Sequence, residues 1–326
     1  MLRSGLWVLR LTTGSPFRQH GATLTTALAA APSAYIGIPT RRPTAWWLET
    51  LRKRAERMYD EHLDLSRPVE FESEDERIAC INFFNAAYRA EESGKAGAHK
   101  LADEVRQWDP ELAECLVLYG NEEGWHRELL DEFLALVGGR VNEMGWMVSS
   151  FYKTYQKAER MESIMLTNLM FETIGATTYR LSLRRVKQPL ARQVLTILTR
   201  DESFHVPLNV HFIREILKHH PERSRTRLKA IYQMVFHSLV LMSLGSRRVA
   251  QDFDQIAWKE LTRAYVENLG RLFVNEDDLD FQPPRHLLAA FGLSRKALKD
   301  TEGPSAVSIA AAEAAARRED VKVDAL

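Results

Sequence analysis

A glutamate followed three residues later by a histidine occurs twice in this chain, as Glu123-x-x-His126 and Glu202-x-x-His205. On a helix, residues three apart project from the same face, so each pair delivers a carboxylate oxygen and an imidazole nitrogen to nearly one point. Such mixed oxygen and nitrogen donors suit a divalent or trivalent metal ion. The two pairs therefore predict a metal site.

Each pair is preceded by an isolated glutamate that has a glycine three residues after it, Glu91 with Gly94 and Glu172 with Gly175. The isolated glutamates stand 32 and 30 positions before the glutamate of the following pair. Two antiparallel helices joined by a short loop bring together mid-helix residues that are about thirty positions apart. We expect each glycine to leave space beside the metal, since glycine inside a helix costs about 1 kcal/mol relative to alanine.

The acidic residues interrupt apolar stripes, which predicts that they face the core. One stripe consists of Leu112, Leu116, Tyr119, Glu123, His126, Leu130 and Phe133. Another consists of Leu195, Leu198, Glu202, His205, Asn209, Phe212 and Ile216. Glu91 fits the stripe of its own segment better than Glu92 does, but the sequence leaves both open as the first ligand.

Buried carboxylates need a compensating charge, because the loss of hydration costs an ionised group several kcal/mol. Two cations remove the problem, since four carboxylates and two imidazoles supply a glutamate and a histidine to each ion and leave carboxylates to bridge. The alternative is a metal-free helical scaffold with protonated acids. The predicted ligands are Glu91, Glu123, His126, Glu172, Glu202 and His205.

The positioning elements are predicted to be helices, and strand signals are nearly absent. Core helices are expected at about 73–107, 110–137, 144–186 and 189–219, with Ser73 as an N-cap, Pro110 in a first turn, and Gly138-Gly139 closing the second helix. A lead-in helix is expected from Thr44 to about Ser66, and two later helices at about 224–251 and 254–273.

The two ends differ in composition from the domain expected at 45–293. Residues 1–44 contain five arginines and no acidic residue, which is typical of a mitochondrial transit peptide and equally of a disordered leader on a cytoplasmic protein. Residues 294–326 form an alanine-rich, low-complexity tail that we do not assign to the core.

The overall composition limits the classes of partner that the chain is expected to bind. The chain has 326 residues with 44 basic and 44 acidic side chains, so no net charge favours nucleic acid. Two cysteines are too few for a disulfide scaffold, and no apolar run is long enough for a membrane-spanning helix. A small-molecule partner is expected.

Two hexapeptides carry a resemblance. Residues 121–126, Asn-Glu-Glu-Gly-Trp-His, and 200–205, Arg-Asp-Glu-Ser-Phe-His, resemble the second- and fourth-helix motifs of acyl-carrier-protein desaturases and alternative oxidases. These belong to the ferritin-like diiron-carboxylate superfamily, and the resemblance covers about Ser73 to Ile216. It implies an all-α, ferritin-like four-helix bundle with accessory helices before and after. It also implies that Asp201 supports His126 and, by pseudo-symmetry, that Glu122 supports His205.

The resemblance further implies two iron ions that activate dioxygen to hydroxylate, N-oxygenate or desaturate a small organic substrate. Electrons would come from a ferredoxin or reductase, because the chain has neither a dinucleotide motif nor a cysteine cluster. Mn/Fe and Mn/Mn centres, and a homodimer, fit the same pattern. Leu198 stands where aryl-amine N-oxygenases carry an extra histidine ligand, which argues against that subgroup.

Two further expectations concern the same site. Tyr119, one turn before Glu123, is a candidate to line the active site or to relay a proton or an electron. The alternative function is that of a ferritin-like ferroxidase or iron-handling protein, which would have no organic substrate.

Overall fold

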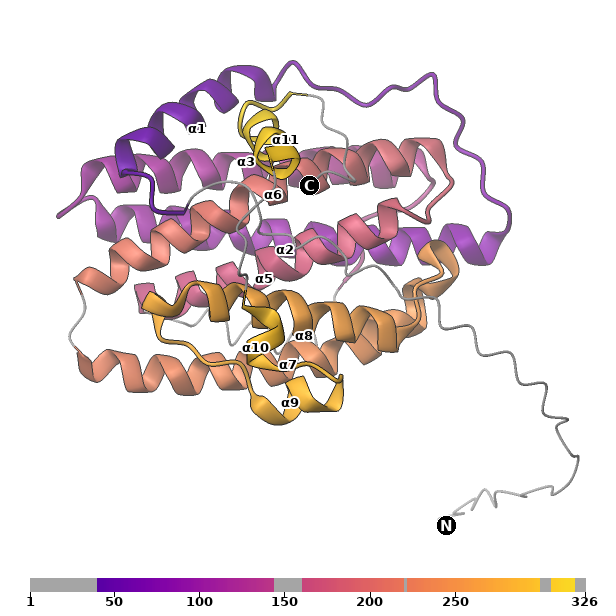
Figure 1. Ribbon diagram of the computed structural model, residues 1–326. Coiled ribbons are helices and arrows are strands. Elements are labelled where there is room, and N and C mark those ends of the chain that lie inside the picture. Colours follow the sequence, from indigo (N-terminus) through magenta and orange to yellow (C-terminus); the bar gives the residue numbers. More distant parts are fainter. Residues whose placement is uncertain (1–39, 144–159, 220–221, 300–305, 320–326) are drawn as a thin grey trace, which may run out of the picture. The chain divides into compact units, whose positions relative to one another are not determined.

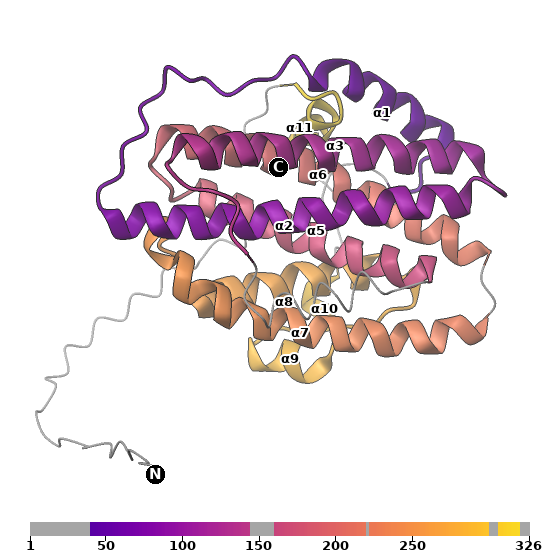
Figure 2. The same ribbon diagram turned by 180° about the vertical axis from the view of Figure 1, so that it is seen from behind.

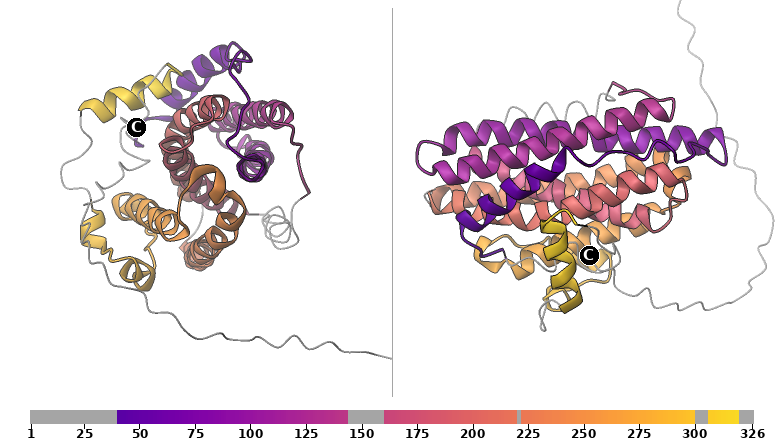
Figure 3. Two further views of the ribbon diagram at one scale, coloured as in Figure 1. Left: turned by 90° about the vertical axis from the view of Figure 1, so that its right-hand side faces the viewer. Right: turned by 90° about the horizontal axis from the view of Figure 1, so that it is seen from above.

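The computed structural model describes residues 40–143, 160–219, 222–299 and 306–319, and these parts of the chain contain helices and no strands (Figure 1). The predicted ligands lie on α2 (Glu74–Val105), α3 (Pro110–Leu136), α5 (Met161–Leu183) and α6 (Pro189–Lys218). α2 packs against α3 and α5, and α6 packs against the same two helices, so the four close a ring of contacts. The left view of Figure 3 looks along them.

Local sequence signals explain where these helices begin and end. The Ser73 side chain accepts a 3.1 Å hydrogen bond from the backbone nitrogen of Glu76, and Asp109 accepts one of 2.9 Å from Leu112. Each caps an otherwise unsatisfied amide at a helix start. Gly138 follows α3 with a φ of +71°, a conformation that glycine adopts without strain. α2 and α3 thus begin, and α3 ends, next to the residues that carry these capping signals.

The flanking helices pack on this ring. α1 (Thr44–Met58) lies on α3, and α7 (Glu222–Asp254) lies against α2 and α5. α8 (Trp258–Asn275) lies beside α7 and packs on α5 (Figure 2). After α8 come the 3-10 turn η1 (Asp277–Leu279) and the short helices α9 (Arg285–Ala290) and α10 (Arg295–Leu298), all of which contact α8.

Two helix boundaries differ from the expectation. The lead-in helix ends at Met58 rather than near Ser66, and the amide of Asp60 then bonds to the carbonyl of Arg57. Beyond it, Asp64 accepts hydrogen bonds from the amide and hydroxyl of Ser66 and forms a local turn instead of a helical one. The third core helix begins at Met161, since Arg160 has extended backbone angles. The predicted helical segment 144–159 lies outside the described residues.

The tail also differs from the expectation. α11 (Ala306–Ala316) is a helix that packs against α6, with Ala312 and Ala315 buried. In α10, Leu298 is buried as well and its carbonyl accepts a hydrogen bond from Asn275. Small alanine side chains let a helix lie close to its neighbour, so an alanine-rich composition was compatible with packing.

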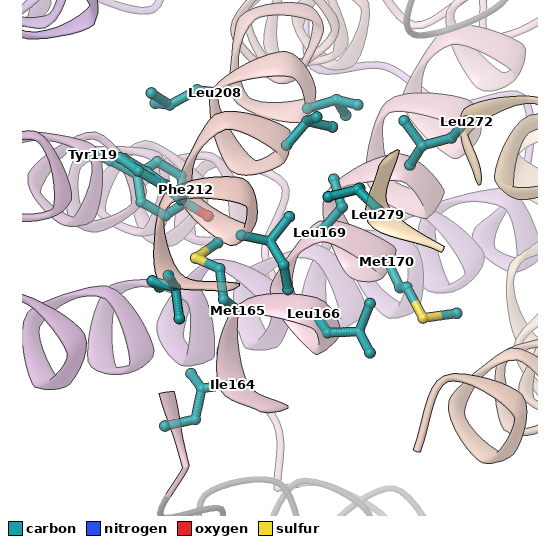
Figure 4. Packing of buried hydrophobic residues seen from close by; sticks show 14 of the residues in the cluster. Tyr119, Ile164, Met165, Leu166, Leu169, Met170, Leu208, Phe212, Leu272 and Leu279 are labelled. Carbon is teal, nitrogen blue, oxygen red and sulfur yellow. The ribbon is translucent and has the colours of Figure 1, made fainter. Parts of the chain in front are cut away.

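The apolar interior is divided by the acidic residues. On α3, Leu116 belongs to one buried cluster and Leu130 to another, with Glu123 and His126 between them. α6 repeats this order, with Leu198 on one side and other apolar residues on the other. Figure 4 shows the first cluster, in which Tyr119 lies near Phe212 and Met165. The polar residues are thus enclosed by apolar packing along the helix axes.

Candidate metal centre

The six residues selected from the sequence converge in this polar layer. α2 contributes one glutamate, α3 and α6 each contribute a glutamate and a histidine, and α5 contributes one glutamate. All are buried, and even the most accessible of them, Glu172, is only 8% exposed. They are Glu91, Glu123, His126, Glu172, Glu202 and His205.

The two Glu-x-x-His pairs form the centre of the cluster. Glu123, His126, Glu202 and His205 each offer one ligand atom, and these four atoms lie within 4.8 Å of one another. His205 Nδ1 is 2.9 Å from Glu123 Oε1 and 3.6 Å from Glu202 Oε2. This buried group of two glutamates and two histidines could hold a metal ion.

The isolated glutamates complete the group on the α2 and α5 side. Glu91 Oε2 lies 3.5 Å from His126 Nδ1, and Glu172 Oε2 lies 3.8 Å from His205 Nδ1. Each glutamate accepts a hydrogen bond at its other oxygen from a tyrosine, as Tyr179 Oη donates to Glu91 at 3.0 Å. The two halves of the site are therefore built alike.

The structure decides between Glu91 and Glu92. Glu92 is half-buried, and its Oε2 accepts a 2.8 Å hydrogen bond from Arg89 on the same helix, away from the cluster. Glu91 is 3% exposed and faces the histidines. Only Glu91 is placed to act as a ligand.

The two glycines have different surroundings. A Cβ added at Gly94 would lie 2.8 Å from Glu123 Oε2, so α2 approaches this carboxylate more closely than alanine allows. At Gly175 the nearest atom would be a Tyr179 ring carbon at 3.5 Å, which is ordinary contact. The expected need for a small residue beside the cluster is met at Gly94. At position 175, none of the surrounding contacts requires glycine.

A second layer of carboxylates holds the histidines. Asp201 Oδ2 lies 3.1 Å from His126 Nε2, and Glu122 Oε2 lies 2.9 Å from His205 Nε2, the pairings implied by the resemblance. An acceptor at Nε2 fixes the proton there and leaves the Nδ1 lone pair directed at the cluster. Both histidines thus direct Nδ1 at the cluster, where it could bind a metal ion when the ring is neutral.

The pKa values of the inner carboxylates are shifted in different directions. Burial and the neighbouring charges of Glu172 and Glu91 raise the pKa of Glu123 well above its usual value. Burial and Glu172 do the same to the pKa of Glu202. For Glu91, burial acts in the same direction, but the nearby His126, whose Nδ1 lies 3.5 Å away, favours the charged carboxylate more strongly and lowers the pKa. The cluster does not tolerate its full negative charge without cations.

Four atoms of the cluster are buried yet make no hydrogen bond of good geometry among the described residues, although two of them, His205 Nδ1 and Glu123 Oε1, lie 2.9 Å apart. These four are the expected ligand atoms. They are Glu123 Oε1, His126 Nδ1, Glu202 Oε2 and His205 Nδ1. Buried polar atoms are almost always paired, because an unsatisfied one costs about 1–3 kcal/mol. Two oxygens and two imidazole nitrogens facing one point fit a hard or borderline metal ion.

The sequence reasoning missed a layer of buried arginines behind the second carboxylates. Arg54 Nε and Nη2 bind Glu122 at 2.9 and 2.8 Å, and Nη2 also binds Asp201 at 3.1 Å. Arg200 joins Asp201 to Glu61, with contacts of 2.9 Å and 2.7 Å. The available signal was that Arg54 continues the buried stripe of α1 after Trp47 and Leu51.

A narrow cavity lies beside the cluster, between α2 and α5. Glu91, Glu172 and Gly94 line it together with the ring of Phe171. The histidines do not line it. A small molecule in this cavity would meet the carboxylate side of the centre.

Comparison with protein-family models, with curated proteins and with solved structures gave no match to this chain. Within the described residues, no helix has the length and apolar character needed to cross a bilayer.

Proposed function

We propose that this protein is a diiron-carboxylate oxidoreductase of the ferritin-like type, in which α2, α3, α5 and α6 form the four-helix bundle. Its centre would take two iron ions and use dioxygen to oxidise a small organic molecule. The observation that carries the proposal is the set of four unpaired, buried ligand atoms on two matched Glu-x-x-His pairs. Such pairs with two further glutamates are the ligand set of this protein type.

The charges around the site support two dications. In the outer layer three guanidinium groups face three carboxylates and balance them, namely Arg54, Arg200 and Arg318 with Glu61, Glu122 and Asp201. The inner layer has four carboxylates and two histidines held as Nδ1 ligands. Two divalent ions would offset four negative charges, which burial alone makes unfavourable.

Iron bound here would supply the electrons that reduce dioxygen. The chain's own residues hold the donors in place: Tyr119 and Tyr179 orient the isolated glutamates, while Glu122 and Asp201 orient the histidines. Oxygen and nitrogen donors also suit manganese, so Mn/Fe and Mn/Mn centres fit the same ligands. Reduction between turnovers needs an external ferredoxin or reductase.

Substrate and dioxygen would approach through the cavity between α2 and α5. All four inner carboxylates line this cavity, whereas the histidines lie behind them and are fixed by hydrogen bonds to Asp201 and Glu122. Phe171 gives this cavity an apolar wall, against which dioxygen or one edge of an organic molecule would lie. α7 and α8, which pack on this side of the ring, would then bound the substrate region.

The narrowness of the cavity also favours a second candidate, an iron-handling protein that oxidises ferrous ions without an organic substrate. The two functions differ in stoichiometry. An oxidase that handles iron consumes oxygen in proportion to added ferrous ion and accumulates ferric product. An oxygenase retains its two ions and consumes oxygen in proportion to electron donor and substrate.

Metal counting with oxygen uptake tests the proposal. We expect the purified chain to bind about two ferrous ions, as the six ligands require, and to consume dioxygen when a donor is supplied. Glu202→Gln should abolish both, whereas Glu92→Gln, which alters a carboxylate outside the cluster, should leave both unchanged. A wild-type chain that binds no iron, and whose helicity and stability do not respond to chelation, would instead support the metal-free scaffold.

A further inference from the structure

Arg318 combines an unusual backbone with a buried charge. It follows α11 with a φ of +54°, in the left-handed region that residues with a Cβ rarely adopt, and it is only 7% exposed. The amide of Glu319 bonds to the carbonyl of Ala314 at 2.9 Å, which closes the helix in the way usually achieved with glycine. An arginine kept in this conformation implies that its side chain has a role.

The side chain of Arg318 reaches the carboxylate layer behind the site. Its Nη2 lies 2.8 Å from Glu61 Oε2 and 3.3 Å from Asp201 Oδ2. Its guanidinium carbon lies 4.5 Å from the ring centre of Trp125, the neighbour of His126. Asp201 Oδ2 is the atom that faces His126 Nε2, so one oxygen connects the arginine to the histidine.

The same end of α11 also contacts the other half of the layer. The carbonyl of Ala315 accepts a 2.5 Å hydrogen bond from Arg54 Nη1, and Arg54 holds Glu122 through Nε and Nη2. Glu122 in turn faces His205. The C-terminal end of a helix more than a hundred residues beyond the last candidate ligand thus reaches Asp201 through Arg318 and Glu122 through Arg54.

We propose that Arg318 is a positioning residue of the metal centre, which fixes Asp201 and through it the ring of His126. The inference rests on the proposed function, because it takes His126 as a metal ligand. Asp201 has two oxygens shared among Arg54, Arg200, Arg318 and His126. Arg200 Nη2 also donates to Oδ2, at 3.1 Å, so without Arg318 this atom keeps one guanidinium partner and loses the one that follows α11. Asp201 is then held from one side only, and its oxygen is less firmly fixed against the imidazole.

The test uses the full-length chain loaded with Co²⁺, whose paramagnetism shifts the Nε2 protons of bound histidines away from the other NMR signals. The exchange rate of each such proton with water reports on its hydrogen bond to the carboxylate behind it. We expect Arg318→Ala to speed exchange at His126, with a much smaller change at His205, which serves as an internal reference. Co²⁺ affinity should fall about tenfold, as with other partners behind metal ligands.

Three further variants separate positioning from folding. Arg318→Gly suits the left-handed backbone, so it should fold like the wild type and still show fast exchange at His126. Arg318→Lys keeps a cation and should partly restore slow exchange. Arg317→Ala is the matched control, because Arg317 is exposed and pairs with Glu319 instead of the buried layer.

The outcomes distinguish the two proposals. Wild-type binding of Co²⁺ with unchanged exchange and affinity in both Arg318→Ala and Arg318→Gly would overturn the positioning role alone. A loss of thermal stability without faster exchange at His126 would also overturn the positioning role, since it would show that the contact is purely structural. A wild-type chain that binds no Co²⁺ would overturn the proposed function and this inference together.

Discussion

The phenol oxygen of Tyr119 lies 2.5 Å from Glu172 Oε1, to which it donates a hydrogen bond inside the polar layer. Burial and the nearby carboxylates Glu123 and Glu172 raise the pKa of Tyr119 well above its usual value, so the hydroxyl keeps its proton at neutral pH. The Tyr119 ring also packs edge-on against His205, with ring centres 5.0 Å apart. Tyr119 therefore touches a candidate ligand from each of two helices.

Tyr119→Phe removes this donor while keeping the ring. We expect the free energy of unfolding to fall by about 1 kcal/mol, the usual contribution of one hydrogen bond. Metal affinity should fall by about tenfold or more, because Glu172 loses its orienting partner. Isothermal titration with ferrous ion under anaerobic conditions measures the change. Tyr179→Phe should act equally through Glu91, and unaltered affinity in both variants would contradict the orienting role.

Neutralising one inner carboxylate should stabilise the metal-free protein. Burial and like charges raise the pKa of Glu123 and of Glu202, so each destabilises the fold as pH rises above the unfolded-state pKa near 4.5. Glu123→Gln removes this cost, and we expect a gain of about 1–3 kcal/mol at neutral pH in chelator. Chemical denaturation with and without metal measures it.

The control for this prediction is Glu92→Gln, which should change stability little because Glu92 is half-buried and lies outside the cluster. Metal should stabilise the wild type and the control but not Glu123→Gln. If Glu123→Gln lowered the stability of the metal-free chain, the inner carboxylates would not repel one another as the geometry indicates.

Alanine at the two glycines should have opposite effects. At Gly94 a Cβ would lie 2.8 Å from Glu123 Oε2, so Gly94→Ala should displace that carboxylate and weaken metal binding. At Gly175 the nearest atom would be 3.5 Å away, so Gly175→Ala should gain up to about 1 kcal/mol from helix propensity. Melting temperature and metal content of the two purified variants give the comparison. Equal metal content would show that Glu123 can move without consequence.

His211 should make stability fall in acid. Burial, together with the charges of Arg214 and Lys218, lowers its pKa from 6.5 to about 4. Its ring stacks on Trp47, and its Nε2 lies 3.1 Å from Thr44 Oγ1. Because the unfolded chain takes up the proton first, stability is fully present above pH 6.5 and is lost as pH falls toward 4.

The expected loss is on the order of 3 kcal/mol across this window. His211→Gln should flatten the curve of unfolding free energy against pH in this range, while His219→Gln serves as the comparison. A curve of unchanged slope in His211→Gln would assign the acid sensitivity to other groups.

Periodicity was enough to predict which faces of α3 and α6 point inward. The alternating spacing of apolar residues placed Glu123 and Glu202 on the inner faces of α3 and α6, and both are buried there. The choice of Glu91 over Glu92 needed three dimensions, since both lie within one turn and only the packing of α2 on its neighbours shows which faces inward.

The outer layer was not predictable from the same signals. Arg54, Arg200 and Arg318 come from segments far apart in the chain, and a buried arginine resembles a surface one in composition. Its burial is stable only because the matching carboxylates arrive from other helices. The packing of α11 could not be predicted either, since an alanine run has no amphipathic pattern. Its contacts also depend on Arg54 and Asp201, which lie far away in the sequence.

The arrival of Arg318 from α11 has a consequence for biosynthesis. A ribosome releases α1 through α8 before α11, so a nascent chain can gather every candidate ligand while the guanidinium behind Asp201 is still missing. Metal captured at that stage would sit in a loosely held centre. α11 and the arginine that follows it would then complete the site, which tightens only after both have left the ribosome.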